Sequence, residues 1–343
     1  MADRTDANPV LVETRRGGWV ENRHRAAFVI RDGDGRVIAK AGDTARPVFP
    51  RSAVKSIQAL AMFASGAAEK FELSDEELAL ACASHQGEAA HIEGVTHFLD
   101  HIGLSAGDLE CGTHAPSSPM AREALRERHE QPDARCNNCS GKHSGMLATS
   151  LALGADTHGY VGRDHPTQAL VRQMIELVTG ETLSPDRVGT DGCSIPTWAA
   201  PLDGFALGFA RMATGKGLPP EIAAAAQRIF DAATRHPFLV GGSDNLDTLA
   251  MEAFGGRLML KGGAEGVYCG AIRDKGLGFA LKIEDGNAAA SRALVAALLL
   301  EFADADEQER ELLGRYAVQP TRNVRGLVVG ETAARRDVIA AAR

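Results

Sequence analysis

The chain has 343 residues, of which 44% are hydrophobic and 24% are charged, and these values are ordinary for a globular protein with a sizeable core. The net charge of −8, with no cluster of lysines and arginines, argues against nucleic acid or an anionic membrane surface as a partner. No apolar run reaches the roughly 18 residues that a membrane-spanning helix needs. The polar segment 1–6 does not resemble a signal peptide, so we expect a cytoplasmic protein.

The pattern of apolar residues predicts strands near both ends of the chain. Near the start, strands are expected at 9–14 and 18–20, and a hairpin at 26–31 and 36–41 around the turn 32–35. Near the end, strands are expected at 258–261, 266–273, 278–283 and 323–329, together with a long helix at 288–302.

The middle of the chain has mostly helical periodicity. A helix should run from Ser52 to about residue 66, and further helices are expected at 74–80, 91–102, 119–130, 144–153, 166–179, 195–214 and 220–234. There is no internal repeat and no obvious linker. We therefore predict an α+β fold in a single catalytic domain, residues 1–343. Its antiparallel sheet should come from about 9–50 and 256–330, packed with a helical region of about 52–255.

The first candidate for chemistry is the Ser-x-x-Lys pair formed by Ser52 and Lys55. A spacing of three places both side chains on one face of a helix. A deprotonated amine can take the proton of a hydroxyl, so such a pair can make a nucleophile. The apolar residues after Lys55 predict a desolvated amine, which favours this reading. The alternative is an N-cap serine followed by a solvated lysine.

Two further segments carry reactive residue types. Residues 82–88 (CASHQGE) bring Ser84, a histidine and a carboxylate together ahead of a helix, which fits either a substrate site or a helix-capping loop. Residues 260–266 (LKGGAEG) end a strand with Lys261 and then allow close backbone approach through glycines. The alternative there is an edge-strand lysine before a turn.

The six cysteines do not suggest a disulfide framework in a long, apparently cytosolic chain. The segment 135–145 contains Cys136 and Cys139 in a Cys-x-x-Cys motif followed by His143, which is half of a possible zinc site, and Cys193 could add a ligand. A thioredoxin-like redox pair is less favoured, because no βαβ unit surrounds the motif. Buried cysteines in a Gly-rich loop are the remaining alternative.

The order of these elements is that of serine β-lactamases and penicillin-binding proteins, with residues 261–263 (KGG) in place of their Lys-Thr-Gly strand. Ser84 lacks the Ser-x-Asn context of those enzymes, so the motifs do not indicate recognition of penicillin. Six segments together resemble a more specific family, the class 3 (asparaginase-II-like) L-asparaginases, which have a β-lactamase-like fold. These segments, in family order, are RSAVKS at 51–56, CASHQGE at 82–88, NCSGKH at 138–143, DGC at 191–193, RHP at 235–237 and KGGAEG at 261–266.

The resemblance implies hydrolysis of L-asparagine to L-aspartate and ammonia. It also implies two Ser-Lys tandems, Ser52 with Lys55 and Ser84 with Lys261, and we expect Ser52 to be the nucleophile and Lys55 its base. Ser84 and Lys261 would relay protons or support the oxyanion and the leaving amine. Two neighbouring cations disfavour each other's protonation, which suits an amine that must act as a base.

The same resemblance implies a zinc ion held by Cys139, Lys142 and Cys193, with Cys136 and His143 left out of the ligand set. Asp191 and Arg51 are the expected substrate-binding residues, and Asp191 would orient either metal-bound water or the amino group of the substrate. A lysine binds zinc only as a neutral amine, which the metal and two thiolates can favour. A homodimer is the expected assembly.

Two alternatives are carried forward. One is another serine amidohydrolase of this architecture, such as a glutaminase or a β-lactam or ester hydrolase, because asparagine and glutamine differ by only one methylene. The other is a binding protein that senses a small molecule and keeps zinc as a structural element. The presence of both serines and both lysines at the motif positions favours an enzyme.

Overall fold

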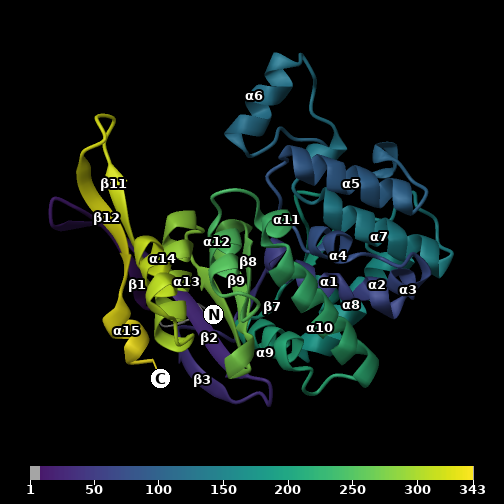
Figure 1. Cartoon of the computed structure of the whole chain (residues 1–343). Coiled ribbons are helices and arrows are strands. Elements are labelled where there is room, and N and C mark those ends of the chain that lie inside the picture. The colour runs from purple at the N-terminus through teal and green to yellow at the C-terminus, as the bar shows by residue number, and fades with distance from the viewer. Residues whose placement is uncertain (1–7, 343) are drawn as a thin grey trace.

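The computed structural model describes residues 8–342, and the N-terminal segment 1–6 therefore lies outside the described residues. Within this range, eight strands form one antiparallel sheet in the order β11-β12-β1-β2-β10-β9-β8, with β3 paired to β2. Figure 1 shows the middle of the chain as a helical region beside this sheet. The predicted α+β class, with an antiparallel sheet built from both chain ends, is confirmed.

The strands of the main sheet come from the first and last parts of the chain: β1 (Val10–Arg16), β2 (Trp19–Asp32), β3 (Val37–Ala41), β8 (Leu258–Gly263), β9 (Val267–Ile272), β10 (Leu277–Ile283), β11 (Val318–Arg322) and β12 (Val328–Ala334). Two small pairs of strands lie outside it: β4 (Pro47–Val48) with β7 (Ala200–Pro201), and β5 (Val188–Thr190) with β6 (Pro196–Trp198).

The helices follow the chain from the first serine motif to the C-terminus. They are α1 (Lys55–Gln58), α2 (Leu60–Ala64), α3 (Ala67–Lys70), α4 (Asp75–Ala81), α5 (Ala89–His101), α6 (Pro119–Glu127), α7 (Ser140–Leu153), α8 (Pro166–Thr179), α9 (Leu202–Thr214), α10 (Pro220–Arg235), α11 (Pro237–Gly241), α12 (Leu246–Ala253), α13 (Ala288–Phe302), α14 (Glu307–Ala317) and α15 (Arg336–Ala340). Among the described residues, no helix is both long and apolar enough to cross a membrane.

The central strands of the sheet are covered on both faces. All six residues of β9 are buried, and because successive side chains of a strand point to opposite faces, both faces of β9 must be covered. Helix α9 packs against β2, β9 and β10, while α13 packs against β1, β10 and β12. Gly278 permits the approach of α9, since a Cβ atom there would lie 2.2 Å from the carbonyl oxygen of Ala206.

Four predictions differ from the structure. The two strands expected at 18–20 and 26–31 form one continuous strand, β2. The helix expected at 195–214 begins only at Leu202, because residues 196–201 pair as strands and Pro201 would break a helix. The strand expected at 323–329 is largely the turn between β11 and β12, where the side chain of Asn323 accepts from the backbone N–H of Arg325 and Leu327. The helix expected from Ser52 to residue 66 is a 3₁₀ turn followed by two short helices.

Candidate active site

Ser52 lies in the 3₁₀ turn η1 (Arg51–Val54), where the chain passes from the first strands into the helical region. Its side chain is half-buried. The preceding residue, Arg51, has a φ angle of 51°, a region that non-glycine residues rarely adopt. Strained backbone of this kind clusters at functional sites, because the surrounding structure must hold it in place.

Lys55 begins α1, and its side chain is buried, with only 1% of the residue exposed. Its amine donates to the hydroxyl of Ser84 at 3.0 Å and to the carbonyl of Ala83, and it lies 3.5 Å from the carbonyl oxygen of Asn138. The expected tandems placed Lys55 with Ser52 and Ser84 with Lys261. The hydrogen bond in the structure therefore joins the lysine of one expected tandem to the serine of the other.

Lys261 lies in β8 and is 3% exposed. Its amine donates to the carbonyl of Gly262 at 2.8 Å and lies 3.8 Å from Oδ2 of Asp247. Burial lowers the pKa of Lys261 to about 8, and the positive charge of Lys55 acts in the same direction, while the carboxylate of Asp247 opposes the change. Lys261 is therefore an amine that is partly neutral near physiological pH.

Strand β8 packs directly against the turn that carries Ser52. A Cβ atom at Gly263 would lie 2.8 Å from the carbonyl oxygen of Pro50 and 3.1 Å from the backbone nitrogen of Ala53. Only a residue without a side chain fits this gap. Gly263 therefore allows β8, the strand that carries Lys261, to lie close to the Ser52 turn.

The loop that carries Ser84 is fixed by its buried neighbour, His85. The backbone N–H of Gly87 donates to Nδ1 of His85 at 3.1 Å, so Nε2 carries the proton and donates to the hydroxyl of Ser140 at 2.8 Å. Burial, with nearby positive charge, holds the pKa of His85 well below its usual value, which keeps the ring neutral. The backbone N–H of Ser84 also donates to the carbonyl of Val240 in α11, which follows the 235–237 motif.

The sulfur and amine groups expected to bind zinc converge at the start of α7. The amine of Lys142 donates to the sulfur of Cys193 at 2.9 Å, and all three side chains of this cluster, Cys139, Lys142 and Cys193, are buried. A hydrogen bond from Cys193, with Lys142 beside it, holds the pKa of Cys139 well below that of an ordinary thiol, despite burial. Burial opposes a charge on Lys142, but the two sulfurs more than offset it and raise its pKa.

Arg51 and Asp191, the expected substrate-binding residues, form an ion pair with 2.6 Å between Nε and Oδ1. Burial opposes ionisation of Asp191, but Arg51, together with Lys142, holds its pKa below the usual value. Oδ2 of Asp191 lies 3.9 Å from the sulfur of Cys193. This pair therefore connects the Ser52 turn to the cysteine cluster.

The two residues left out of the expected ligand set have other environments. Nδ1 of His143 and the hydroxyl of Tyr160 form a hydrogen bond of 2.6 Å. Cys136 lies in the turn before α7, and burial raises its pKa. Among the described residues, no three His, Cys, Asp or Glu side chains gather as a group that could hold a metal ion. The expected zinc set contains only two such side chains and a lysine.

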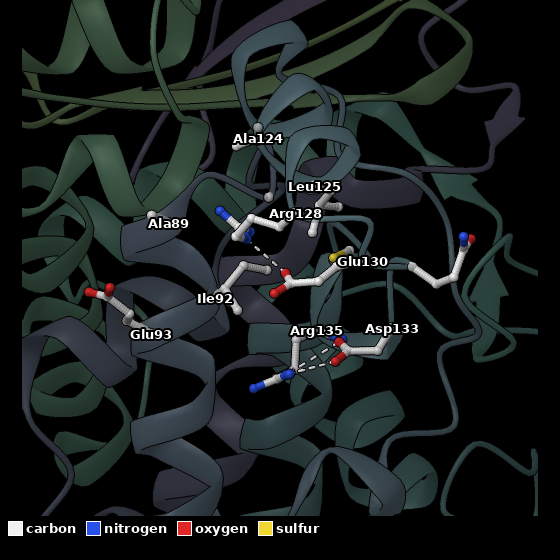
Figure 2. A pocket seen from close by; sticks show the side chains of 13 residues that line it. Ala89, Ile92, Glu93, Ala124, Leu125, Arg128, Glu130, Asp133 and Arg135 are labelled. Atoms are coloured by element: carbon white, nitrogen blue, oxygen red, sulfur yellow. Dashed lines mark hydrogen bonds and ion pairs between the residues drawn. The ribbon is translucent and has the colours of Figure 1, made fainter.

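A hollow of about 590 Å³ opens between α5 and α6 and is shown in Figure 2. Gly87 and Cys136, which line it, belong to the loops that carry Ser84 and Cys139. Its arginines are paired with acids: Arg128 with Glu130 at 2.9 Å, and Arg135 with Asp133 at 2.6 Å. With their charges compensated, these arginines offer no evident anion site, and the reactive groups lie elsewhere.

One residue beside Lys261 was missed by the sequence motifs, and the role of a histidine within a motif was not predicted. Asp247, in the first turn of α12, contacts the Lys261 segment, and no motif marks it because an acid in the first turn of a helix is common. The role of His85 in fixing its loop depends on Ser140, 55 positions away, which sequence spacing does not reveal. Asn245, a helix-capping residue just before Asp247, is the one local signal that could have drawn attention to this segment.

Comparison with known proteins gives one family over nearly the whole chain: the model described as "L-asparaginase II" matches residues 12–334. No curated protein matches the chain. Similar solved structures include Mglu in its native form, with 14% identity over 87% of this chain and 69% of that one and a TM-score of 0.46. A β-lactamase from Mycobacterium bovis has 15% identity over 81% of this chain and 95% of that one, with a TM-score of 0.41. At such TM-scores these likenesses carry no argument about activity.

Proposed function

Since the chain belongs to the L-asparaginase II family, we propose that it hydrolyses L-asparagine to L-aspartate and ammonia. Membership of this family makes the chain an amidohydrolase that acts on a small molecule, and the choice of asparagine is the proposal. The observation that carries it is the hydrogen bond from the buried Lys55 amine to the half-buried Ser84 hydroxyl, with a second buried amine, Lys261, close enough to Lys55 for their charges to interact. Serines next to buried amines are the groups that nucleophilic amide hydrolysis requires.

In the proposed mechanism Ser52 is the nucleophile. Its hydroxyl oxygen attacks the side-chain amide carbon of asparagine, and its proton passes to Lys55, which acts as the base in its neutral amine form. The C–N bond then breaks, and a proton delivered through Ser84, which is hydrogen-bonded to Lys55, leaves with the nitrogen as ammonia. Water attacks the resulting ester carbon, releases aspartate and returns the proton to Ser52. Lys261, with its pKa of about 8, can accept a proton from that water.

Arg51 and Asp191 are proposed to bind the charged α-groups of the substrate. Their ion pair places a guanidinium and a carboxylate at the edge of the Ser52 turn, and an amino acid carries the complementary carboxylate and ammonium. The strained backbone at Arg51 would hold this pair in a fixed position relative to Ser52.

The cysteine cluster fits a zinc ion by the chemistry of its donors. Two thiols and an amine converge, and one thiol, Cys139, already has a pKa well below normal, so a thiolate is available without large cost. We propose that Cys139, Lys142 and Cys193 hold zinc when it is bound, where the ion would act as a Lewis acid beside the substrate. Loading would require Lys142 to lose its proton, since an ammonium has no lone pair. It would also require Cys193 to lose its proton, because the hydrogen bond with Cys139 and burial raise the pKa of Cys193.

The test of the nucleophile uses Ser52→Ala and Ser84→Ala in the full chain, with ammonia release from asparagine as the assay. Ser52→Ala should abolish turnover, and a variant that keeps the wild-type rate would remove Ser52 from this role. Because Lys55 contacts Ser84, that serine is the alternative nucleophile. Mass spectrometry after labelling with an electrophilic serine reagent distinguishes the two, because the label should lie on Ser52.

The substrate and metal proposals need separate measurements. Side-by-side kcat/KM values for asparagine and glutamine test the substrate, and a higher value for glutamine would favour a glutaminase. Elemental analysis should give about one zinc per chain, falling sharply in Cys139→Ser and persisting in the control Cys136→Ser. The reverse pattern would replace the proposed ligands with the Cys-x-x-Cys motif. A cytoplasmic homodimer is also proposed, and light scattering of the purified protein tests the assembly.

A further inference from the structure

Asp247 is a buried carboxylate that belongs to none of the segments discussed for the mechanism. It lies in the first turn of α12, where the side chain of Asn245 caps its backbone N–H at 3.3 Å, and the residue is 2% exposed. Charged groups are rarely this buried unless they are paired. The groups that contact the Asp247 carboxylate therefore indicate its structural role.

Two contacts of the Asp247 carboxylate, both made by Oδ2, go to the segment that carries Lys261, whereas the buried Oδ1 has no hydrogen-bond partner among the described residues. Oδ2 accepts a hydrogen bond from the backbone N–H of Gly262 at 2.8 Å, and the same oxygen lies 3.8 Å from the amine of Lys261. The first contact fixes the backbone of β8 directly after Lys261. The second places a negative charge beside its ammonium form.

Several other charged or titratable groups surround Lys261 and Asp247. Lys261 is faced by Lys55 from α1, by Cys82 at the end of α4 and by Cys139 before α7. Asp247 is faced by Tyr268 of β9, whose pKa is raised by burial and by this carboxylate, and Arg292 and Tyr316 lie close enough to Tyr268 to act on it. Without Asp247, two buried amines would face each other and Lys261 would lose the largest opposite charge that acts on it.

Building on the proposed function, we infer that Asp247 is a positioning residue for Lys261: its carboxylate anchors the strand end on which Lys261 stands and stabilises the charged form of that amine. The amine of Lys261 would then depend on this carboxylate to titrate in the pH range in which the proposed reaction runs. The hydrogen bond and the ion pair of the Asp247 carboxylate go to Gly262 and Lys261 of β8, so its effect on the reaction should pass through Lys261.

The variant Asp247→Asn separates the two contributions. An asparagine keeps one carbonyl oxygen that can accept from the N–H of Gly262, but it removes the negative charge. Loss of the charge should lower the proton affinity of Lys261, because an opposite charge at this distance favours the charged form. The expected shift of the Lys261 titration midpoint is about one pH unit or more toward acid.

The titration can be followed directly by NMR of the full chain labelled with ¹³C-lysine, because the chain contains only eight lysines. The Lys261 signal is assigned from its loss in Lys261→Arg. The matched control is Asp274→Asn, which removes a carboxylate paired with Arg257 at 3.0 Å, just before the other end of β8. A midpoint that moves toward acid in Asp247→Asn and stays in place in Asp274→Asn supports the inference. An unchanged midpoint in a folded Asp247→Asn protein overturns it.

Activity provides an independent readout. In the plot of kcat/KM against pH, the limb that Lys261 controls should move to lower pH in Asp247→Asn by the same amount as the NMR midpoint. A merely structural role for Asp247 would instead lower kcat/KM equally at all pH values. If Asp247→Asn does not fold, Asp247→Glu, which keeps the charge, should retain a Lys261 midpoint close to that of the wild type, and a midpoint shifted toward acid there overturns the inference. Absence of ammonia release in the wild type would refute the proposed function, but the NMR titration would still decide the role of Asp247.

Discussion

The close approach of β8 to the Ser52 turn can be tested by giving Gly263 a side chain. A Cβ atom there would lie 2.8 Å from the carbonyl oxygen of Pro50 and 3.1 Å from the nitrogen of Ala53, and both are backbone atoms that cannot rotate away. The φ angle of Gly263 is −122°, which alanine adopts easily, so any effect of Gly263→Ala is steric. The variant therefore isolates the distance between the two segments.

The size of the effect follows from the distances. To restore an ordinary contact of 3.4 Å from 2.8 Å, the strand and the turn must separate by 0.6 Å. Overpacking of this kind costs about 1–3 kcal/mol of unfolding free energy. A displacement approaching 1 Å at a catalytic group can cost about 100-fold in rate, so we expect kcat/KM to fall by about 10-fold or more.

The assays are urea unfolding and ammonia release from asparagine, with Gly314→Ala as the control. Gly314 lies in α14, and a Cβ atom there would meet nothing within 4 Å. Alanine should therefore stabilise that helix by about 0.5–1 kcal/mol and leave activity unchanged. If Gly263→Ala retained both the unfolding free energy and the kcat/KM of the wild type, the close contact would have no role in aligning the site.

Three further predictions concern buried groups. Burial lowers the pKa of Lys261 from 10.5 to about 8, so between pH 8 and pH 10.5 the unfolded chain binds more protons than the folded one, and the free energy of unfolding rises with pH. The variant Lys261→Met should lack this rise when the free energy is measured by urea unfolding. Parallel curves of free energy against pH for wild type and variant would contradict this prediction. His85→Ala should cost about 1–3 kcal/mol and lower kcat more than it changes KM, because the Ser84 loop loses its bond to Ser140; an unchanged kcat would refute this. Tyr160→Phe leaves the N–H of Glu110 and Nδ1 of His143 without the hydroxyl, and calorimetry should show a loss of about 1–3 kcal/mol, with kcat/KM for asparagine unchanged.

Much of the sheet could be predicted because its strands carry local signals. The hairpin around 32–35 and the strands at 258–283 combine apolar runs with turn residues, and both lie where the structure has them. The strand predicted at 323–329 is wrong because apolar residues at its end outweighed the turn signals of Asn323 and Gly326. The late start of α9 depends on pairing with distant strands, which no local pattern contains.

For the candidate site, the residues could be predicted from the sequence but their contacts could not. Ser52, Lys55, Ser84 and Lys261 could be nominated from short motifs, because each reactive residue type stands in a recognisable local context. Their contacts could not be predicted. Whether Lys55 reaches Ser52 or Ser84 depends on how α1 is oriented against the loop after α4, and this is decided by packing of the whole helical region.

The candidate site lies at the junction of the sheet and the helical region, so its integrity should depend on the stability of the whole fold. Ser52 follows the N-terminal strands, whereas Lys261 stands on β8, which joins those strands only through β9 and β10. The two residues therefore meet only when both chain ends have formed one sheet. Asp247 adds a bond from the helical region to β8 at the residue after Lys261. A site assembled in this way should be lost together with the global fold, so ammonia release and urea unfolding should share one midpoint, and activity lost at lower urea would show that β8 or α12 separates first.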